Sequence, residues 1–243
     1  MLELRNISWT TPDGRQILDN VNLTIPDRKL VAITGPNGSG KTTLARIIEG
    51  INTPTSGKIM LNGEDITDLD VTERAKKGIS FAFQQPVRFK GLTVRMLLEI
   101  AAGGKIGEAR LCDIMASVGL CARDYVDREI NSTLSGGEMK RIEIASVLAR
   151  KTPMSIFDEP EAGIDIWSFA GLIKTFDAMR SSLEGTIIIV SHQERILSIA
   201  DEIVLLADGG VSKKGSGAEV LRALIERGDA GTACAKKEAV ING

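Results

Sequence analysis

Residues 35–42 read Gly-Pro-Asn-Gly-Ser-Gly-Lys-Thr, which fits the phosphate-binding pattern G-x-x-x-x-G-K-[ST]. The pattern lies between an apolar run at 30–34 and a helix-like segment at 42–49, the order that a phosphate loop requires. Glycines let backbone amides approach phosphate oxygens, Lys41 reaches the β and γ phosphates, and Thr42 offers a hydroxyl to Mg²⁺. An ordinary glycine-rich turn is the alternative, but this context disfavours it. The predicted nucleotide contacts are Gly35, Pro36, Asn37, Gly38, Ser39, Gly40, Lys41, Thr42 and Thr43.

Two adjacent carboxylates, Asp158 and Glu159, follow an apolar strand-like run at 154–157. A carboxylate at the end of a buried strand can hold the hydration shell of Mg²⁺ beside a phosphate loop, so Asp158 is a predicted metal ligand. Glu159 points elsewhere on an extended chain, and we predict that it polarises a water for attack on the γ phosphate. Without the other motifs, these two residues would indicate only the end of a strand before a turn. The phosphate loop needs such a partner, which favours the catalytic interpretation.

The segments that must position these residues alternate between strand and helix. A turn at Asp13-Gly14 joins two strand-like patterns, which predicts an antiparallel start. Helical periodicity then dominates residues 86–148, an inserted helical sub-domain, before strands and helices alternate as in a parallel sheet. The expected strands are 2–9, 17–25, 30–34, 58–61, 79–83, 154–157, 186–190 and 203–207, and the expected helices are 42–49, 72–77, 94–102, 108–118, 137–148, 167–180, 194–200 and 218–226. Residues 229–243 are expected to form a flexible tail.

Composition narrows the class of protein. The 243 residues carry a formal net charge of -2 with acidic and basic residues interspersed, which gives no electrostatic footprint for nucleic acid. The three cysteines form no C-x-x-C pair and fit a reducing cytosol, and we expect Cys112 and Cys121 as small core residues. The start lacks a signal-peptide pattern, and no apolar run approaches the roughly 20 residues that span a bilayer. We therefore expect a cytoplasmic chain that does not insert into a membrane.

Further motifs follow the order known from one family. The segment Leu134-Ser-Gly-Gly-Glu138 opens an amphipathic helix, and Gln84 closes the strand expected at 79–83. The stretch Ala162-Gly-Ile-Asp165 follows the carboxylate pair, and the chain's only histidine, His192, follows the apolar run at 187–190. With these motifs the sequence resembles the ATP-binding cassette (ABC) family over nearly its whole length. We refer below to residues 134–138 as the signature segment.

The resemblance implies a fold, a reaction and a set of contacts. The fold would be the α/β P-loop NTPase of ABC type, with a mixed sheet core, an antiparallel β sub-domain and a helical sub-domain in a single domain at 1–228. The reaction would be hydrolysis of Mg-ATP in a transient, ATP-dependent head-to-tail homodimer, with Lys41 and Glu159 as catalytic residues. Gln84 would contact Mg²⁺ and the attacking water, and His192 the γ phosphate. The contacts to the other cassette would come from Ser135, Gly136, Gly137, Glu138 and Asp165.

The adenine contact of the family has no direct counterpart in this sequence. Family members usually stack adenine on an aromatic residue near the first hairpin, where this chain has Thr11 and Pro12. Trp9 lies two or three places early and is more often a core residue in such a strand. The residue that contacts the base is therefore left open.

Some stretches resemble one branch of the family, the SufC group of iron-sulfur cluster assembly ATPases. These stretches are 81–87, 135–144, 163–166 and 215–228, and Glu138 stands where transporter cassettes more often carry glutamine. This resemblance implies SufB- or SufD-like scaffold proteins as partners. The alternative is the nucleotide-binding subunit of a membrane transporter, coupled to a separate permease that docks near Gln84 and the helical sub-domain.

Overall fold

The computed structural model describes residues 1–83, 89–131, 133–182, 185–224 and 226. Within these ranges the strands form two sheets. An antiparallel sheet has the order β2-β1-β4-β5, and a mixed sheet has the order β10-β9-β3-β8-β7-β6. The strands are β1 Leu2–Thr10, β2 Gln16–Ile25, β3 Leu30–Thr34, β4 Ser56–Leu61, β5 Glu64–Asp65, β6 Ile79–Ala82, β7 Met154–Asp158, β8 Thr186–Val190, β9 Glu202–Ala207 and β10 Gly210–Ser216.

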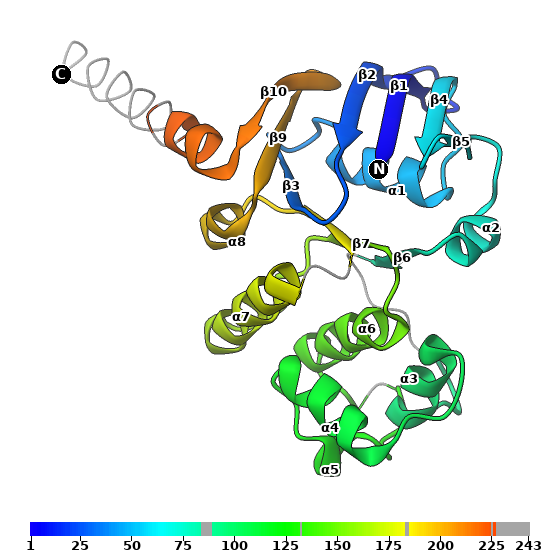
Figure 1. Cartoon of the computed structure of the whole chain (residues 1–243), viewed down its shortest axis with the longest axis vertical. Coiled ribbons are helices and arrows are strands. Elements are labelled where there is room, and N and C mark those ends of the chain that lie inside the picture. Colours follow the sequence, from blue (N-terminus) through cyan, green and yellow to red (C-terminus); the bar gives the residue numbers. More distant parts are fainter. Residues whose placement is uncertain (84–88, 132, 183–184, 225, 227–243) are drawn as a thin grey trace.

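The helices fall into two groups around these sheets. The structure gives α1 Lys41–Glu49, α2 Val71–Lys76, α3 Val94–Ala102, α4 Glu108–Ser117, α5 Ala122–Tyr125, α6 Gly136–Arg150, α7 Ile166–Ser182 and α8 Glu194–Ile199, and residues 217–224 are also helical. Figure 1 shows the antiparallel sheet and α1 at one end of the molecule and helices α3 to α6 at the other, with β6 and β7 between them. In the described residues, no helix is long and apolar enough to cross a bilayer.

The central strands β3, β7 and β8 of the mixed sheet are buried on both faces, which explains their continuous apolar runs. Along β8, Ile187 and Ile189 pack with the helical side of the core, whereas Ile188 and Val190 pack with α1 and the antiparallel sheet. Successive side chains of a strand point to opposite faces, so one apolar run serves two cores. Helix α1 thus lies between the two sheets, with Leu44 and Ile48 fully buried.

Most predicted elements are present, and a few differ from the prediction. The parallel core strands and helices α1, α3, α4, α6, α7 and α8 lie at their expected places within a few residues. The antiparallel pair β4–β5 confirms the hairpin that the turn at Asn62-Gly63 predicts, whereas helix α5 and strand β10 were not predicted. The prediction that Cys112 and Cys121 are core residues was wrong, because both are exposed. Cys112 lies on the outer face of α4, and Cys121 precedes the first turn of α5.

Candidate functional site

The carboxyl ends of the parallel strands bring the predicted site residues to one edge of the mixed sheet. Val190 of β8 lies opposite both Ile33 of β3 and Asp158 of β7. The phosphate loop follows β3, Glu159 follows β7, and His192 follows β8, so these groups leave the sheet side by side. Ligand sites of open α/β sheets form at such an edge.

Glycines in the phosphate loop hold positions that a side chain could not occupy. Gly35 has φ 148°, and a Cβ there would lie 2.0 Å from the carbonyl oxygen of Leu206. Gly40, the residue before α1, has φ 95°, and a Cβ there would lie 2.5 Å from Leu18 Cδ2. The loop therefore packs tightly against β9 and β2 and leads directly into the start of α1, the position in which a phosphate loop binds its ligand.

Lys41 lies inside the loop and binds its carbonyls. Nζ donates to the carbonyl oxygens of Gly35 at 2.8 Å and Pro36 at 2.9 Å. The side chain is buried, and this burial lowers the pKa of its ammonium. The hydroxyl of Ser39 is also buried and has no hydrogen-bond partner. A buried cation next to an unpaired hydroxyl fits a phosphate group, which would accept hydrogen bonds from both.

Thr42 and Asp158, two of the predicted metal ligands, lie in contact with each other. Thr42 Oγ1 donates to Asp158 Oδ1 at 3.2 Å, although 116 residues separate them in the chain. Asp158 is 1% exposed, and burial raises the pKa of its carboxyl. A hydroxyl and a carboxylate oxygen side by side are hard oxygen donors that fit Mg²⁺, which would offset the cost of keeping this carboxylate ionised.

Glu159 turns out of β7 into an open cavity beside the phosphate loop. Its backbone has φ 45°, and its amide donates to the carbonyl of Val190 at 2.9 Å. The cavity measures about 370 Å³. Its lining residues are Arg15, Ile17, Asn37, Gly38, Gly40, Lys41, Thr42, Thr43 and Glu159. The structure therefore brings Glu159 and the phosphate loop together around one space.

Arg15 and Ile17 are lining residues that the sequence did not identify. Both follow the hairpin turn at Asp13-Gly14, at the start of β2, and reach the cavity because β2 passes beside α1. Their only signal was a position next to the first hairpin, where the family contacts the base. Trp9 instead packs against the core of the antiparallel sheet.

His192 leaves β8 at the same edge, in a segment fixed by Ser191. The Ser191 hydroxyl donates to Glu161 Oε1 at 2.5 Å and accepts from the Gln193 amide at 3.0 Å. Burial raises the pKa of Glu161. The His192 side chain itself is exposed. The structure thus ties the segment after Glu159 to the segment that carries His192.

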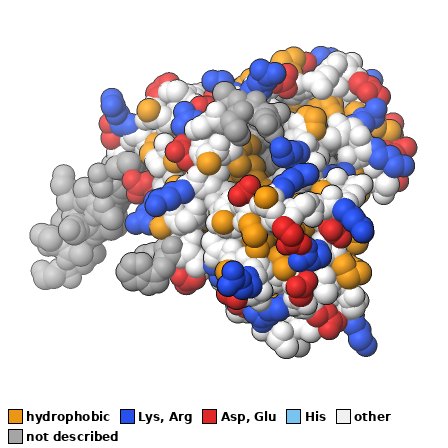
Figure 2. All heavy atoms as spheres, turned by 60° about the horizontal axis from the view of Figure 1, so that its bottom comes forward, with side chains coloured by type: hydrophobic (Ala, Val, Ile, Leu, Met, Phe, Trp, Pro, Cys, Tyr) orange, Lys and Arg blue, Asp and Glu red, His pale blue; other side chains and the backbone are white. Residues whose placement is uncertain are grey.

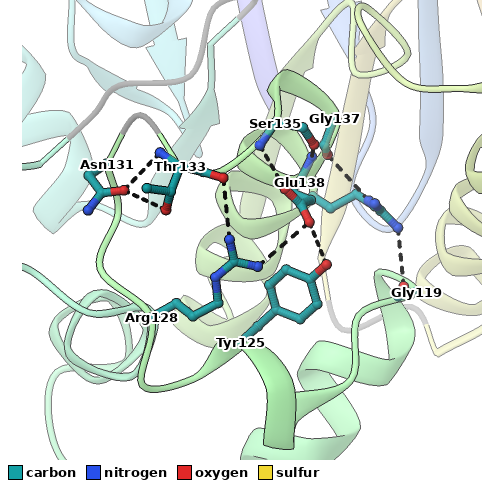
Figure 3. Close-up of polar contacts among 9 residues, drawn as sticks. Gly119, Tyr125, Arg128, Asn131, Thr133, Ser135, Gly137 and Glu138 are labelled. Carbon is teal, nitrogen blue, oxygen red and sulfur yellow. Dashed lines mark hydrogen bonds and ion pairs between the residues drawn. The ribbon is translucent and has the colours of Figure 1, made fainter.

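The signature segment opens α6 with two reciprocal hydrogen bonds. Ser135 Oγ accepts from the Glu138 amide at 3.2 Å, and Glu138 Oε2 accepts from the Ser135 amide at 2.7 Å, which is a capping box. Figure 3 shows Glu138 turned back toward Tyr125 and Arg128. The Tyr125 hydroxyl donates to Glu138 Oε1, which also lies 3.8 Å from the Arg128 guanidinium. Glu138, predicted as a nucleotide contact, therefore shapes the segment through its own side chain.

Ser135 and Gly136 are exposed at the start of α6, and none of the described signature residues lines the cavity beside Lys41. Asp165 accepts from the Ser168 amide at 2.9 Å and caps α7. The nearby Gly163 carbonyl approaches Gly137 so closely that a Cβ there would lie 3.1 Å from it. Gln84, the other predicted metal contact, lies outside the described residues.

The ABC transporter family matches residues 18–162, which include the phosphate loop, the signature segment and the carboxylate pair. An uncharacterized ABC transporter ATP-binding protein of Methanocaldococcus jannaschii is 40% identical over 215 residues, covering 85% of this chain and 86% of that protein. The sulfate/thiosulfate import ATP-binding protein of Synechocystis is 34% identical over 225 residues, covering 89% of this chain and 61% of that protein.

The fold agrees with solved cassettes. The dimeric structure of an ATP-binding cassette in a post-hydrolysis state, bound to ADP and Pi, matches with a TM-score of 0.80 at 27% identity, over 89% of this chain and 98% of that chain. The predicted fold class is thereby confirmed, as is the predicted reaction class. This chain belongs to the ABC transporter family, and it is an ATPase with the ABC-type P-loop fold.

Proposed function

We propose that two copies of this chain bind ATP head to tail, so that each ATP lies between the phosphate loop of one copy and the signature segment of the other. The observation that carries the proposal is the separation described above: the cavity at Lys41 lacks the signature segment, while Ser135 and Gly136 are exposed at a helix start elsewhere. A helix N-terminus attracts phosphate, so this exposed start suits a second copy's γ phosphate. A similar cassette that is dimeric in a post-hydrolysis state with ADP and Pi supports the pairing of two copies.

Within such a site, each residue would have a separate task. Lys41 and His192 would stabilise charge on the γ phosphoryl group, and Glu159 would accept a proton from the attacking water. Thr42 and Asp158, with Gln84, would hold Mg²⁺. The metal, when bound, would neutralise charge on the phosphate oxygens. Asp165, as the cap of α7 near Gly137, would carry the state of one site to the other.

The partner that the motion drives is a second question. The similar proteins are mostly ATP-binding proteins of transporters, which supports a membrane permease as the partner. In that arrangement the chain would lie against the cytoplasmic side of a membrane. An apolar hollow of about 150 Å³ lies between β6 and the helical segment, lined by Phe81, Phe89, Leu97 and Met139 among others. We propose this hollow as the place where a permease segment docks. Figure 2 shows one face of the molecule with basic, acidic and hydrophobic side chains interleaved.

A SufB- or SufD-like scaffold is the second candidate partner. The observation that favours it is Glu138, whose ion pair and hydrogen bonds give a specific use to the residue by which this chain departs from most transporter cassettes. None of the similar proteins named above carries iron-sulfur assembly in its name. The permease is therefore the better supported partner.

The test of the shared site is Glu159→Gln, which keeps the shape of the side chain and removes the base. We expect this variant to bind ATP normally, to hydrolyse it at least about a hundredfold more slowly, and to form a dimer with Mg-ATP. Turnover assays and size-exclusion chromatography with light scattering measure these effects, and Glu99→Gln on α3 serves as the control. A Glu159→Gln chain with wild-type turnover would refute the assignment.

The partner is tested by affinity purification of tagged protein from its own source. A multi-helix permease in the detergent-extracted fraction that stimulates hydrolysis would support the transporter. A soluble SufB- or SufD-like scaffold with the same effect would support the second candidate instead.

A further inference from the structure

Helix α6 carries two buried ionic side chains that reach the end of β6. Lys140 is fully buried, and the side chain of Glu143 is 13% exposed. Lys140 Nζ donates to the carbonyl of Phe83, and Glu143 Oε1 accepts from the amide of Phe83 at 2.8 Å. Both backbone polar groups of one residue are therefore held by one helix.

The two side chains also support each other. Lys140 Nζ lies 3.3 Å from Glu143 Oε2, and the three-residue spacing places both on the same face of α6. Burial raises the pKa of the Glu143 carboxyl, and the nearby ammonium opposes this shift. Because an unpaired buried charge is strongly destabilising, removal of either partner disturbs the other and releases Phe83.

The position of Phe83 connects this cluster to hydrolysis. Ala82 lies opposite Phe157 in the parallel pairing of β6 with β7, so Phe83 leaves the sheet beside Asp158. Its carbonyl belongs to the peptide bond that joins it to Gln84, a predicted metal contact. Helix α6, which carries Lys140, begins at the signature segment, and Ser135 lies five residues before Lys140.

We propose that Lys140 and Glu143 are positioning residues for ATP hydrolysis. By holding Phe83, they couple α6, which begins at the signature segment, to the sheet edge that carries Asp158 and Glu159. The inference rests on the proposed function, because it uses the predicted roles of Gln84 and the signature segment. In the head-to-tail pair, α6 would contact the ATP of one site at its start while fixing the Phe83 peptide of the other.

The experiment compares Lys140→Met, Lys140→Arg and Glu143→Gln with Arg150→Met. Arg150 lies on the same helix and also binds a backbone carbonyl, that of Ala75 at 2.8 Å, so it is a matched control. We expect Lys140→Met to lower kcat about tenfold or more and to raise the Mg²⁺ concentration for half-maximal turnover, with ATP affinity within about twofold of wild type. Lys140→Arg should restore part of kcat, and Arg150→Met should change neither quantity.

Glu143→Gln keeps an acceptor for the Phe83 amide and serves if Lys140→Met does not fold; its kcat should fall about threefold or more. A folded Lys140→Met with wild-type kcat and Mg²⁺ requirement would overturn the inference, as would an equal loss in Arg150→Met. In a Gln84→Ala background, Lys140→Met should add less than about twofold. A wild-type rate in Gln84→Ala would refute the proposed role of Gln84, whereas a slow Gln84→Ala beside a normal Lys140→Met would refute the present inference.

Discussion

The backbone of Glu159 has an unusual conformation for the residue that we assign as the base. A left-handed φ at a non-glycine residue costs of the order of 1 kcal/mol, and it persists only where neighbouring contacts fix it. Here the amide binds the carbonyl of Val190, and the carbonyl accepts from the amide of Ala162 at 3.0 Å. These bonds turn the chain away from β7, so that Asp158 stays buried while Glu159 reaches the cavity.

Glu49 is a buried carboxyl outside the nucleotide cavity. It lies at the end of α1, where the negative end of the helix dipole disfavours a charge, and its Oε2 has no hydrogen-bond partner. Burial raises its pKa from the ordinary value of 4.5 to about 7; Arg46 opposes the shift, and Glu143 adds to it. Between pH 4.5 and about 7, Glu49 therefore keeps its proton in the folded chain and has lost it in the unfolded chain.

We predict that Glu49 makes the chain less stable as pH rises from about 4.5 to 7, because folding in this window requires uptake of a proton. Below this window both states are protonated, and above it the cost is complete. Glu49→Gln removes this contribution and should raise Tm at pH 8 by about 2–4 °C per kcal/mol recovered. Thermal unfolding at several pH values measures the slope, with exposed Glu64→Gln as the control. Identical pH slopes in Glu49→Gln and wild type would contradict the assignment.

Among the elements, α5 shows how a short helix supports the site. It is four residues long, yet it places Tyr125 against Glu138 and beneath Arg128, whose guanidinium carbon lies 5.0 Å from the ring centre. The hydrogen bond from Tyr125 lowers the pKa of Glu138 and raises that of Tyr125 itself. Tyr125 and Arg128 thus hold the Glu138 side chain and stabilise the capping box at the start of α6.

Tyr125→Phe keeps the ring and removes this hydrogen bond. We predict a loss of about 1 kcal/mol in stability and a several-fold higher protein concentration for half-maximal turnover, because the signature segment is less well held. Nucleotide binding by the phosphate loop should not change. ATPase assays over a range of protein concentrations measure the effect, with exposed Arg123→Ala on α5 as the control. An unchanged concentration dependence would show that the signature segment functions without the hydrogen bond from Tyr125 to Glu138.

The elements that the sequence predicted are those with strong local patterns. The run Ile187–Val190 and the phosphate loop are recognisable because burial on both faces and phosphate binding each leave a continuous signal. Strand β10 has a weaker pattern, because an edge strand with two lysines and two glycines lacks apolar periodicity. The contacts of Lys140 with Phe83, 57 residues away, and of Tyr125 with Glu138, 13 residues away, follow no helix or strand spacing, so the sequence pattern does not reveal them.

Across the molecule, the phosphate loop and the signature segment lie apart, since none of the described signature residues lines the cavity beside Lys41. In the head-to-tail pair that we propose, the edge that carries Lys41, Asp158 and Glu159 would supply phosphate and metal contacts, and the start of α6 would supply a second anion-binding terminus to the ATP of the other copy. The partner that receives the motion is set by surfaces of another protein, which explains why motifs for phosphate chemistry were predicted with more success than the partner was.

A site shared between two chains can be tested by mixing two variants that are each inactive alone. Lys41→Ala removes the phosphate-loop contact, and Gly137→Asp blocks the signature segment with a like charge. In a head-to-tail pair of the two variants, one site carries both changes and the other carries neither. Random pairing of equal amounts should thus recover about a quarter of wild-type turnover, because half of the pairs are mixed and each has one intact site. A mixture as inactive as its components would mean that both motifs act within one chain.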